Sequence, residues 1–337
     1  MRIKSSVTID DVAAAAGVST ATVSRVLNKS LPVVESTAAR VRAAADQLGY
    51  VPKAAARHLA QGATNTLGLL LPGVSDDFFR PLVSSITERA AETGYTLLIA
   101  IRPTGRAGQA HQLPLGKQNT DGLLIFDQSL YDGELQRLHA IHFPVVLLYH
   151  APPADLAVPC VLIENREGMR AITEHLITGH GRRRIAFLRG PIGNEDAQQR
   201  EEGYRAALAA HGIPLDPTLV GAGEFQEAPA RATVAHWIAE GRNFDAIVAG
   251  DDGSAAGALE ALRQAGRRVP HDVAVVGFDD APRACYLSPR LTTVRAPGAA
   301  VGRAAIDQLL RLIAGQAAEL RTLLPTSLVI RHSCGCP

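Results

Sequence analysis

The sequence predicts an α/β protein with a small helical N-terminal module and a larger body of two lobes, each built on a parallel sheet. A chain of 337 residues is too long for one ordinary core. From residue 64 onward, short continuous apolar runs alternate with amphipathic stretches, as in a doubly wound sheet with helices between its strands. The first sixty residues instead show only short helical patterns.

The composition excludes several classes of protein. Apolar residues make up 47% of the chain and charged residues 20%, so the chain should fold rather than remain disordered. No run approaches the roughly 18 apolar residues of a membrane helix, and the N-terminal stretch lacks a signal-peptide core. We therefore expect a cytoplasmic protein. The four cysteines do not form a secreted disulfide framework and are expected to be reduced: Cys160, Cys285, Cys334 and Cys336.

The net charge of +1 conceals an uneven distribution. Residues 1–62 carry eight Lys and Arg against four Asp and Glu, a net charge of +4, whereas the remainder carries 26 against 29, a net charge of −3. A basic module on a mildly acidic body suits phosphate binding by one end, because that attraction depends on local charge. An ordinary solvated surface gives the same imbalance, so charge alone leaves DNA binding open.

Two short helices are predicted near the N-terminus. Thr8 and Asp11 form a capping-box pattern at the start of the first helix, which Gly17 ends. Ser19 is the N-cap candidate of a second helix that runs to about Asn28. Two short helices joined by a glycine turn have the geometry of a helix-turn-helix, whose second helix enters the major groove.

The second helix has one apolar face and one polar face. Val23, Val26 and Leu27 are expected to be buried. The residues left for the outside are small, polar or basic: Thr20, Ala21, Thr22, Ser24, Arg25 and Asn28. An arginine can donate two hydrogen bonds to a guanine edge, while hydroxyl and amide groups suit phosphate oxygens. Taken alone, the pair of helices also fits an ordinary solvated αα-hairpin.

A third helix is predicted from about Ser36 to Leu48, with Val41, Ala45 and Leu48 facing the core and Gly49 as its stop. Residues 53–61 have helix-forming composition but are too short to form a stable helix alone.

The motifs "GVSTATVSRVLN" and "LGYVPKAAARHL" occur in this order near the N-terminus. The stretch that holds them resembles the headpiece, hinge and first core strand of the LacI/GalR family of repressors. The resemblance implies a homodimeric transcription regulator that binds a pseudo-palindromic operator. This sequence departs from the family pattern at Val34, because family members usually have a serine there that caps the third helix.

The resemblance also assigns DNA-binding roles. Thr20, Ala21 and Arg25 match base-reading positions. Thr22, Ser24 and Asn28 match backbone-contacting positions. In the hinge, Leu59 matches a leucine that wedges into the central base step, and Ala56 is small enough for close helix packing. The complete implied set is Thr8, Ser19, Thr20, Ala21, Thr22, Ser24, Arg25, Asn28, Tyr50, Ala56 and Leu59.

The body contains continuous apolar runs that are typical of buried parallel strands. One sheet is expected from the runs at 67–71, 96–100, 121–126 and 145–148, and a second from those at 184–190, 245–250 and 273–280. Ligands of such folds bind beyond the carboxyl ends of the strands. For residues 102–120 no local structure is predicted, because Gly, Pro and Gln interrupt any regular pattern.

The motifs "IENREGMRAITEHL", "QQREEGYRAAL", "VAGDDGSAAGALEAL" and "VPHDVAVVGFDD" resemble the periplasmic-binding-protein-like core of the same family. This resemblance implies an effector pocket for a small molecule, with a carbohydrate as the expected class. The implied contacts are Phe79, Arg200, Phe225, Asp251 and Asp279. Asp251 stands where the family often has asparagine. An Arg and an Asp near a cleft can also pair only with each other.

The expected domains are a headpiece at 1–52, a hinge at 53–63 and an effector-binding and dimerisation core at 64–337. Within the core we expect a first lobe at about 64–160 and 292–322. The second lobe is expected at about 161–291 and 323–337.

Two further interpretations have less support. The tail "RHSCGC" brings His332, Cys334 and Cys336 together, but a tetrahedral metal site needs a fourth ligand, so no metal or other cofactor is expected. Hydrolase, P-loop and metalloprotease motifs are lacking, so an enzyme is not expected. A sugar-transport binding protein would share the two-lobed body, but it would have a signal peptide and no headpiece.

Overall fold

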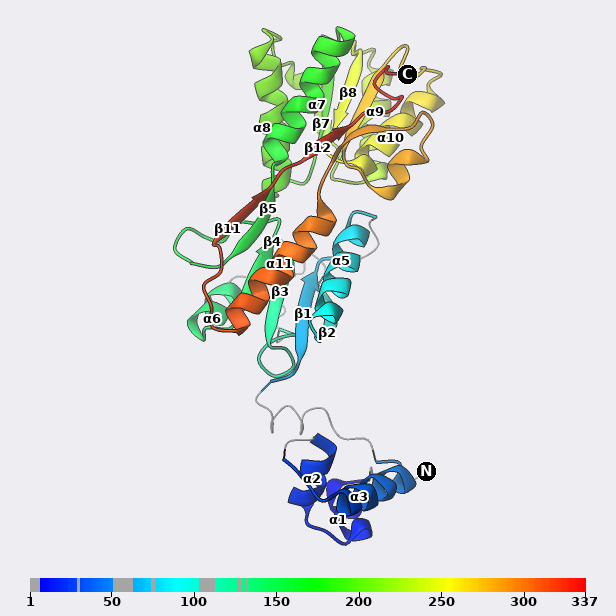
Figure 1. Ribbon diagram of the computed structural model, residues 1–337. Coiled ribbons are helices and arrows are strands. Elements are labelled where there is room, and N and C mark those ends of the chain that lie inside the picture. Colours follow the sequence, from blue (N-terminus) through cyan, green and yellow to red (C-terminus); the bar gives the residue numbers. More distant parts are fainter. Residues whose placement is uncertain are drawn as a thin grey trace. The chain divides into compact units, whose positions relative to one another are not determined.

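The computed structural model describes residues 7–28, 31–50, 63–73, 77–102, 113–126, 129–130 and 133–337. Contacts divide the chain into two compact units, Met1–Asn65 and Thr66–Pro337. The described part of the smaller unit is helical, and the larger unit is an α/β body with two sheets (Figure 1). The hinge expected at 53–63 lies almost entirely outside the described residues.

The smaller unit packs three helices around a core centred on Val12, Val23 and Val41, none of which is exposed. They are α1 (Ile9–Ala16), α2 (Thr20–Asn28) and α3 (Glu35–Leu48). The predicted capping box is present, since Thr8 Oγ1 accepts from the Asp11 amide and the Asp11 carboxylate accepts from the Thr8 amide. Gly17 ends α1 with φ 64°, a left-handed conformation that glycine adopts without strain.

Three details of the headpiece differ from expectation. Helix α3 begins at Glu35 rather than Ser36, although its N-cap Val34 offers no side-chain hydrogen bond. Leu48 is 38% exposed, because it lies at the end of α3 beyond the three-helix core, so its assignment to the core was wrong. Val26 and Leu27 are only half-buried, because they pack at the margin of that core.

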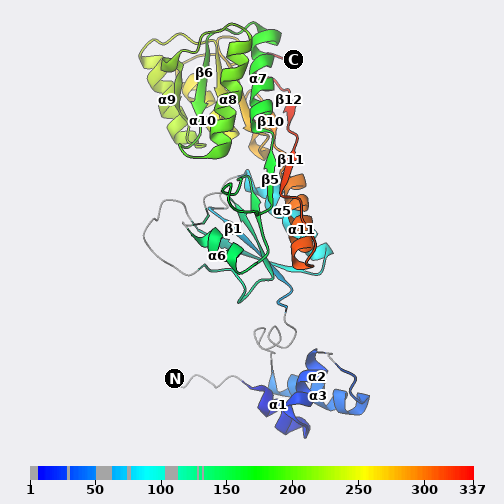
Figure 2. The same cartoon turned by 90° about the vertical axis from the view of Figure 1, so that its left-hand side faces the viewer.

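The first sheet of the larger unit has the order β11-β5-β4-β3-β1-β2, and all its neighbouring strands are parallel. Its four predicted runs are confirmed as β1, β2, β3 and β4. The strands are β1 (Thr66–Leu71), β2 (Thr96–Ile101), β3 (Gly122–Phe126), β4 (Val145–Leu148), β5 (Cys160–Ile163) and β11 (Arg321–Leu324). Helix α6 (Glu134–Ala140) covers one face, and α5 (Phe79–Glu92) with α11 (Gly298–Ile313) covers the other (Figure 2).

The second sheet has the order β12-β10-β9-β8-β6-β7, and only the β10–β12 pair is antiparallel. Its three predicted runs are confirmed as β6, β8 and β9. The strands are β6 (Ile185–Arg189), β7 (Val220–Ala222), β8 (Ala246–Ala249), β9 (Ala274–Asp279), β10 (Thr292–Arg295) and β12 (Ser327–Val329).

Two helix pairs cover this second sheet on opposite faces (Figures 1 and 2). One pair is α7 (Asn165–His180) with α8 (Glu195–Ala210), and the other is α9 (Glu227–Ala239) with α10 (Asp252–Gln264). Short 3-10 turns occur at Pro217–Leu219 and Pro282–Cys285.

The chain passes between the lobes three times, a few residues later than expected at each crossing. Strand β5 ends at Ile163 in the first sheet, β10 still belongs to the second sheet through Arg295, and β11 belongs to the first sheet through Leu324. The expected crossings near 160, 292 and 322 are therefore shifted. Where the chain crosses between lobes is decided by which strands pair with each other. The apolar pattern of one segment does not show which strand it pairs with.

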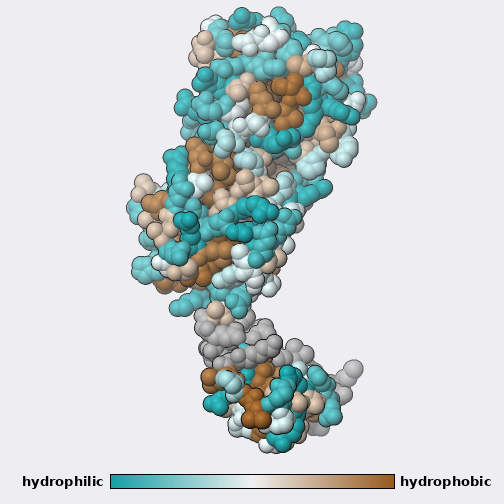
Figure 3. Space-filling view, viewed as in Figure 1, coloured by the Kyte–Doolittle hydropathy of each residue, from teal (hydrophilic) through white to brown (hydrophobic). Residues whose placement is uncertain are grey.

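On the face that Figure 3 shows, polar groups predominate, and apolar groups reach the surface in both lobes. Arg102, the first residue of the segment 102–120 for which no structure was predicted, forms a buried ion pair with Glu134, with a 2.6 Å contact at the end of β2. Within the described residues, no helix has both the length and the apolar character needed to span a bilayer.

Candidate functional site

The outer surface of α2 carries the predicted base-reading residues. The Ser19 hydroxyl caps this helix, because its Oγ accepts from the Thr22 amide at 3.2 Å. Thr20, Ala21 and Arg25 are exposed, and Val23 on the opposite side is buried. The helix therefore presents two small residues and one guanidinium to solvent, which suits contact with base edges.

The predicted backbone-contacting residues lie on the flanks of α2. Thr22, Ser24 and Asn28 are half-buried, and Asn28 Nδ2 donates to Ser24 Oγ at 3.2 Å. This bond leaves the second amide proton of Asn28 and the Ser24 hydroxyl proton as donors for phosphate oxygens.

Two other implied DNA contacts have structural roles. Thr8 caps α1 through its hydroxyl and amide, and Tyr50 packs against the three-helix core. Ala56 and Leu59 lie outside the described residues.

The second lobe contains a cavity of about 320 Å³ at the carboxyl ends of β8 and β9. Three predicted effector residues line it: Phe225, Asp251 and Asp279. Its other lining residues include Glu227, Asp252 and Arg283. Phe79 and Arg200 are not among the described residues that line it. A site beyond the carboxyl ends of parallel strands is where α/β folds bind small molecules.

Arg200 lies directly behind this cavity and is only 3% exposed. Its Nη2 is 3.1 Å from Asp279 Oδ1, its Nε donates to Asn165 Oδ1 at 2.8 Å, and its Nη1 donates to the Gly250 carbonyl at 2.8 Å. The guanidinium carbon lies 3.8 Å from the centre of the Phe278 ring and 5.3 Å from that of Phe225. These contacts fix the guanidinium and orient the Asp279 carboxylate at the cavity wall.

Asp251 uses its carboxylate to cap α10. Its Oδ1 accepts from the Ser254 amide and its Oδ2 from the Gly253 amide, both at 2.9 Å. Burial raises the pKa of this carboxyl, while the bonds to Ser254 and Gly253 oppose that shift. The family's frequent asparagine also caps helices well, so this substitution preserves a structural role at the cavity wall.

Comparisons with known proteins agree with both halves of this architecture. Residues 8–53 match the model of bacterial regulatory proteins of the lacI family, and residues 173–334 match that of the periplasmic binding protein-like domain. The regulator GalR of Salmonella typhimurium is 36% identical over 333 residues, covering 98% of this chain and 96% of GalR. The chain belongs to the LacI family. It is a DNA-binding transcription regulator and not an enzyme.

Solved structures support the same assignment for this LacI-family regulator. A lac repressor dimer bound to operator and the anti-inducer ONPF has a TM-score of 0.82 and 28% identity, covering 98% of this chain and 99% of the repressor. A CelR–cellobiose complex has a TM-score of 0.70 and 32% identity, covering 97% of this chain and 99% of CelR.

Phe79 begins α5 of this LacI-family regulator and belongs to an aromatic cluster in the first lobe. Its ring is half-buried and packs edge-on against Phe78 and Phe126, with centroid distances of 5.3 and 5.1 Å. Phe78 also contacts Tyr149, whose buried hydroxyl has no hydrogen-bond partner among the described residues. Phe79 therefore contributes to a packed aromatic wall.

Sequence reasoning missed several residues that organise the cavity. Asn165 links Arg200 to Asp196, whose Oδ1 accepts from Asn165 Nδ2 at 2.7 Å. Arg283 Nε lies 3.6 Å from Asp77 Oδ2, which joins the cavity rim of the second lobe to the first lobe. Asn165 lies in the family motif "IENREGMRAITEHL", but only the fold shows that this residue contacts Arg200.

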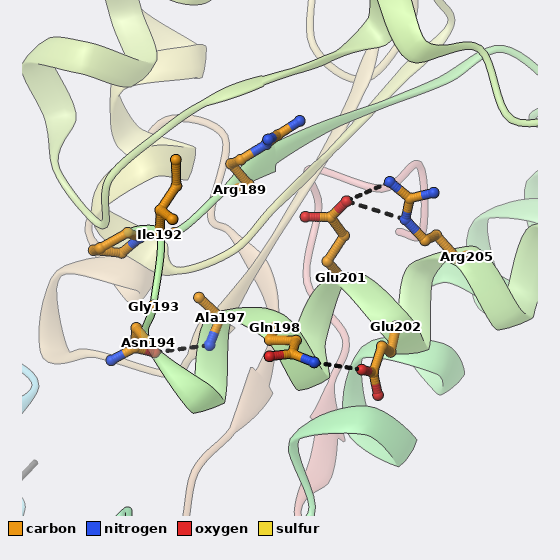
Figure 4. Close-up of a pocket in the computed structure, with 11 residues that line it drawn as sticks. Arg189, Ile192, Gly193, Asn194, Ala197, Gln198, Glu201, Glu202 and Arg205 are labelled. Carbon is orange, nitrogen blue, oxygen red and sulfur yellow. Dashed lines mark hydrogen bonds and ion pairs between the residues drawn. The ribbon is translucent and has the colours of Figure 1, made fainter.

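A larger hollow of about 400 Å³ lies beside α8 (Figure 4). Four of its polar side chains pair with one another: Glu201 with Arg205 at 2.6 Å, and Gln198 with Glu202 at 3.0 Å. Arg189 also lines it, and its buried Nε has no hydrogen-bond partner among the described residues. Asn194 caps α8 through the Ala197 amide. The smaller cavity beside Arg200 is the better ligand site, because it lies beyond the carboxyl ends of β8 and β9.

Proposed function

We propose that this LacI-family regulator is a cytoplasmic homodimeric repressor whose effector is a sugar or sugar derivative. The observation that carries the proposal is the Arg200–Asp279 pair beside a cavity that Phe225 also lines. A fixed carboxylate accepts hydrogen bonds from hydroxyls, and an aromatic ring packs against the apolar face of a sugar. The relatives support this class, since one solved neighbour is a complex of CelR with cellobiose.

The charged side chains that line the cavity narrow the chemical class of the proposed effector. Asp251, Asp252, Asp279 and Glu227 line it, with Arg283 as the basic group. A polyhydroxylated neutral or cationic molecule suits this lining better than a strongly anionic one, because like charges repel.

In the headpiece, we assign base reading to Thr20, Ala21 and Arg25, and backbone contacts to Thr22, Ser24 and Asn28. The further expected DNA contacts are Thr8, Ser19 and Tyr50. The exposure of Arg25 on α2 supports its role. The roles of Ala56 and Leu59 in a hinge at 53–63 rest on the family resemblance alone.

Exposed apolar residues support the proposed dimer. Leu98, Ile99 and Ile101 of the edge strand β2 are 40%, 43% and 42% exposed. Apolar side chains gathered on an edge strand are a liability unless a partner covers them. One of the similar solved structures is itself a repressor dimer.

Effector binding would act by shifting the balance between two arrangements of the lobes. The contact between Asp77 and Arg283 spans the two lobes beside the cavity, so a ligand there can favour one arrangement over the other. An effector changes operator affinity only through its differential affinity for the two arrangements.

The proposal is tested by electrophoretic mobility shift on promoter DNA from the genes beside this one, with a panel of mono- and disaccharides. We expect specific binding by the free protein and a change of affinity with at least one sugar. Failure to bind any double-stranded promoter DNA specifically would contradict the repressor assignment. Specific binding with no sugar response, together with a response to anionic metabolites, would contradict the effector class.

A further inference from the structure

The C-terminal tail lies against the end of helix α7 and brings two cysteines to two histidines. His175 and His180 lie in the last two turns of α7. Cys334 and Cys336 lie five and seven residues after β12, which ends at Val329 in the second sheet. One ligand atom from each of these four residues lies within 4.8 Å of all the others. Cys334 is fully buried, and the other three are half-buried.

Three separations among these atoms, those that join His175, His180 and Cys336, match the edges of a metal-centred tetrahedron. The Nε2 atoms of His175 and His180 are 3.3 Å apart, and Cys336 Sγ lies 3.5 Å from His180 Nε2 and 3.7 Å from His175 Nε2. Zinc bonds of about 2.0 Å to nitrogen and about 2.3 Å to sulfur predict edges of about 3.3 Å between nitrogens and about 3.5 Å between nitrogen and sulfur. These three atoms therefore leave space for a tetrahedral ion, and Cys334 Sγ, within 4.8 Å of each of them, is the fourth ligand atom in reach.

We propose that His175, His180, Cys334 and Cys336 bind one zinc ion. Two thiolates and two imidazoles in a tetrahedral arrangement select zinc among the common divalent cations. All four positions are supplied by the protein, which is the pattern of a structural rather than a catalytic zinc site.

The backbone around the four residues allows the C-terminal tail to approach the end of α7 closely. Gly181 ends α7 directly after His180 with φ 66°, and Gly335 between the two cysteines has φ 115°. A Cβ on Gly335 would lie 3.1 Å from His180 Nδ1, so a side chain there would crowd the imidazole. Glycine at position 335 thus allows the tail to turn and both sulfurs to face the histidines.

The surroundings also suit metal ligands. Thr292 Oγ1 donates to Cys334 Sγ at 3.2 Å, an outer contact of the kind that orients a thiolate. Burial lowers the pKa of both His175 and His180, which favours the neutral imidazole that a metal requires. Burial raises the pKa of the Cys336 thiol, so its deprotonation would depend on the positive charge of the ion.

The bound ion would tie the tail to α7 across 161 residues of sequence. The other end of α7 carries Asn165, which holds Arg200 beside the effector cavity. An ion that binds the folded second lobe and not the unfolded chain stabilises that lobe.

The first test measures metal content and coordination in the full-length protein, purified without a histidine tag. We expect one zinc ion per chain by elemental analysis. After chelation and reloading with cobalt, we expect the visible bands of a tetrahedral site and a near-ultraviolet thiolate band. Zinc should also raise the melting temperature of the chelated protein. A chain that retains no zinc, gives no tetrahedral cobalt spectrum and melts at the same temperature with and without zinc overturns the proposal.

The second test uses Cys336→Ser and His180→Asn, with Cys285→Ser and His271→Asn as matched controls. Cys285 and His271 are both exposed and lie outside the cluster. We expect at least a tenfold loss of zinc affinity in the first pair and none in the controls. Circular dichroism and operator binding verify that each variant folds. Equal zinc affinity in all four variants, or a Cys334–Cys336 disulfide without metal in the freshly purified protein, would show that the cluster is not a zinc site.

Discussion

Asp279 Oδ1 lies 3.1 Å from Arg200 Nη2, and the two side chains are only 9% and 3% exposed. Asp279 ends strand β9, whereas Arg200 lies in the middle of α8. Arg200 makes two further hydrogen bonds, to Asn165 and to the Gly250 carbonyl, so it holds several elements together behind the cavity. Removing Arg200 would therefore break all of these contacts at once, whereas Asp279→Asn keeps an oxygen within reach of Arg200 and disturbs fewer of them.

Asp279→Asn should abolish the effector's influence on operator affinity while leaving affinity without effector nearly intact. The amide keeps the volume of the carboxylate but loses its charge and one acceptor. Fluorescence anisotropy of labelled operator, with and without effector, measures both quantities. Arg200→Ala should lose the same response and also lower the free energy of unfolding by about 3–5 kcal/mol, because it leaves a buried charge unpaired. A normal effector response in Asp279→Asn would remove Asp279 from the pocket.

Arg25→Ala should lower operator affinity by about 1–3 kcal/mol and relax the preference at one base pair. The reason is the loss of a base-edge contact from the exposed face of α2. Titration against a set of singly substituted operators gives the preference at each position. Arg40→Ala on the exposed surface of α3 is the control for loss of general positive charge. If Arg25→Ala kept every base preference, Arg25 would contact only phosphate.

Thr8→Ala should destabilise the headpiece by about 1 kcal/mol, because the side-chain half of the capping box is lost. The box also predicts a dependence on pH. The Thr8 amide, followed by its hydroxyl, lowers the pKa of Asp11 below 3.8 in the folded headpiece. A lowered folded pKa contributes stability that is present above about pH 4 and is lost as the pH falls through the folded value.

Nuclear magnetic resonance of headpiece signals during acid titration measures this dependence. Asp11→Asn should lack the acid-dependent loss of stability between pH 4 and the folded pKa of Asp11. An identical acid profile in Asp11→Asn and the wild type would show that the capping box has no electrostatic role.

Gly203→Ala should lower the free energy of unfolding by about 1–3 kcal/mol, despite the higher helix propensity of alanine. Helices α7 and α8 cross so closely at Gly203 that a Cβ there would lie 2.2 Å from the Arg166 carbonyl oxygen. Gly179→Ala is the matched control, since its Cβ would meet only the His175 ring at 3.5 Å. The control should be neutral or stabilising by up to about 1 kcal/mol. Chemical denaturation measures the free energy of unfolding of both variants. Equal values would contradict the close crossing of α7 and α8 at Gly203.

Leu59→Ala should weaken specific operator binding and reduce DNA bending, while binding to random DNA should hardly change. The family resemblance places this leucine as a wedge at a central pyrimidine–purine step, which unstacks readily, while phosphate attraction is retained. Bending is measured by circular permutation of the operator fragment, alongside affinity for specific and random duplexes. Equal bending and an unchanged ratio of affinities would leave Leu59 as a packing residue.

The sequence by itself determined the features that depend on near neighbours. The Thr8–Asp11 box, the Ser19 cap and the glycine stops Gly17 and Gly49 involve contacts within about four residues, so their signals are continuous in the chain. Strands buried on both faces, such as β1, could also be predicted, because each is one uninterrupted apolar run. Family motifs added the pocket residues that local patterns cannot connect.

Only the tertiary structure decided which distant segments meet. Strand β11 has an alternating exposed pattern with no apolar run, and its place beside β5 follows from pairing rather than from composition. The sequence showed three local ligand candidates in the tail, yet the ring that lies 3.5 Å from Cys336 Sγ is that of His180 on α7. A ligand cluster depends on where two segments are held in space, and in this chain the packing of the tail against α7 sets that distance.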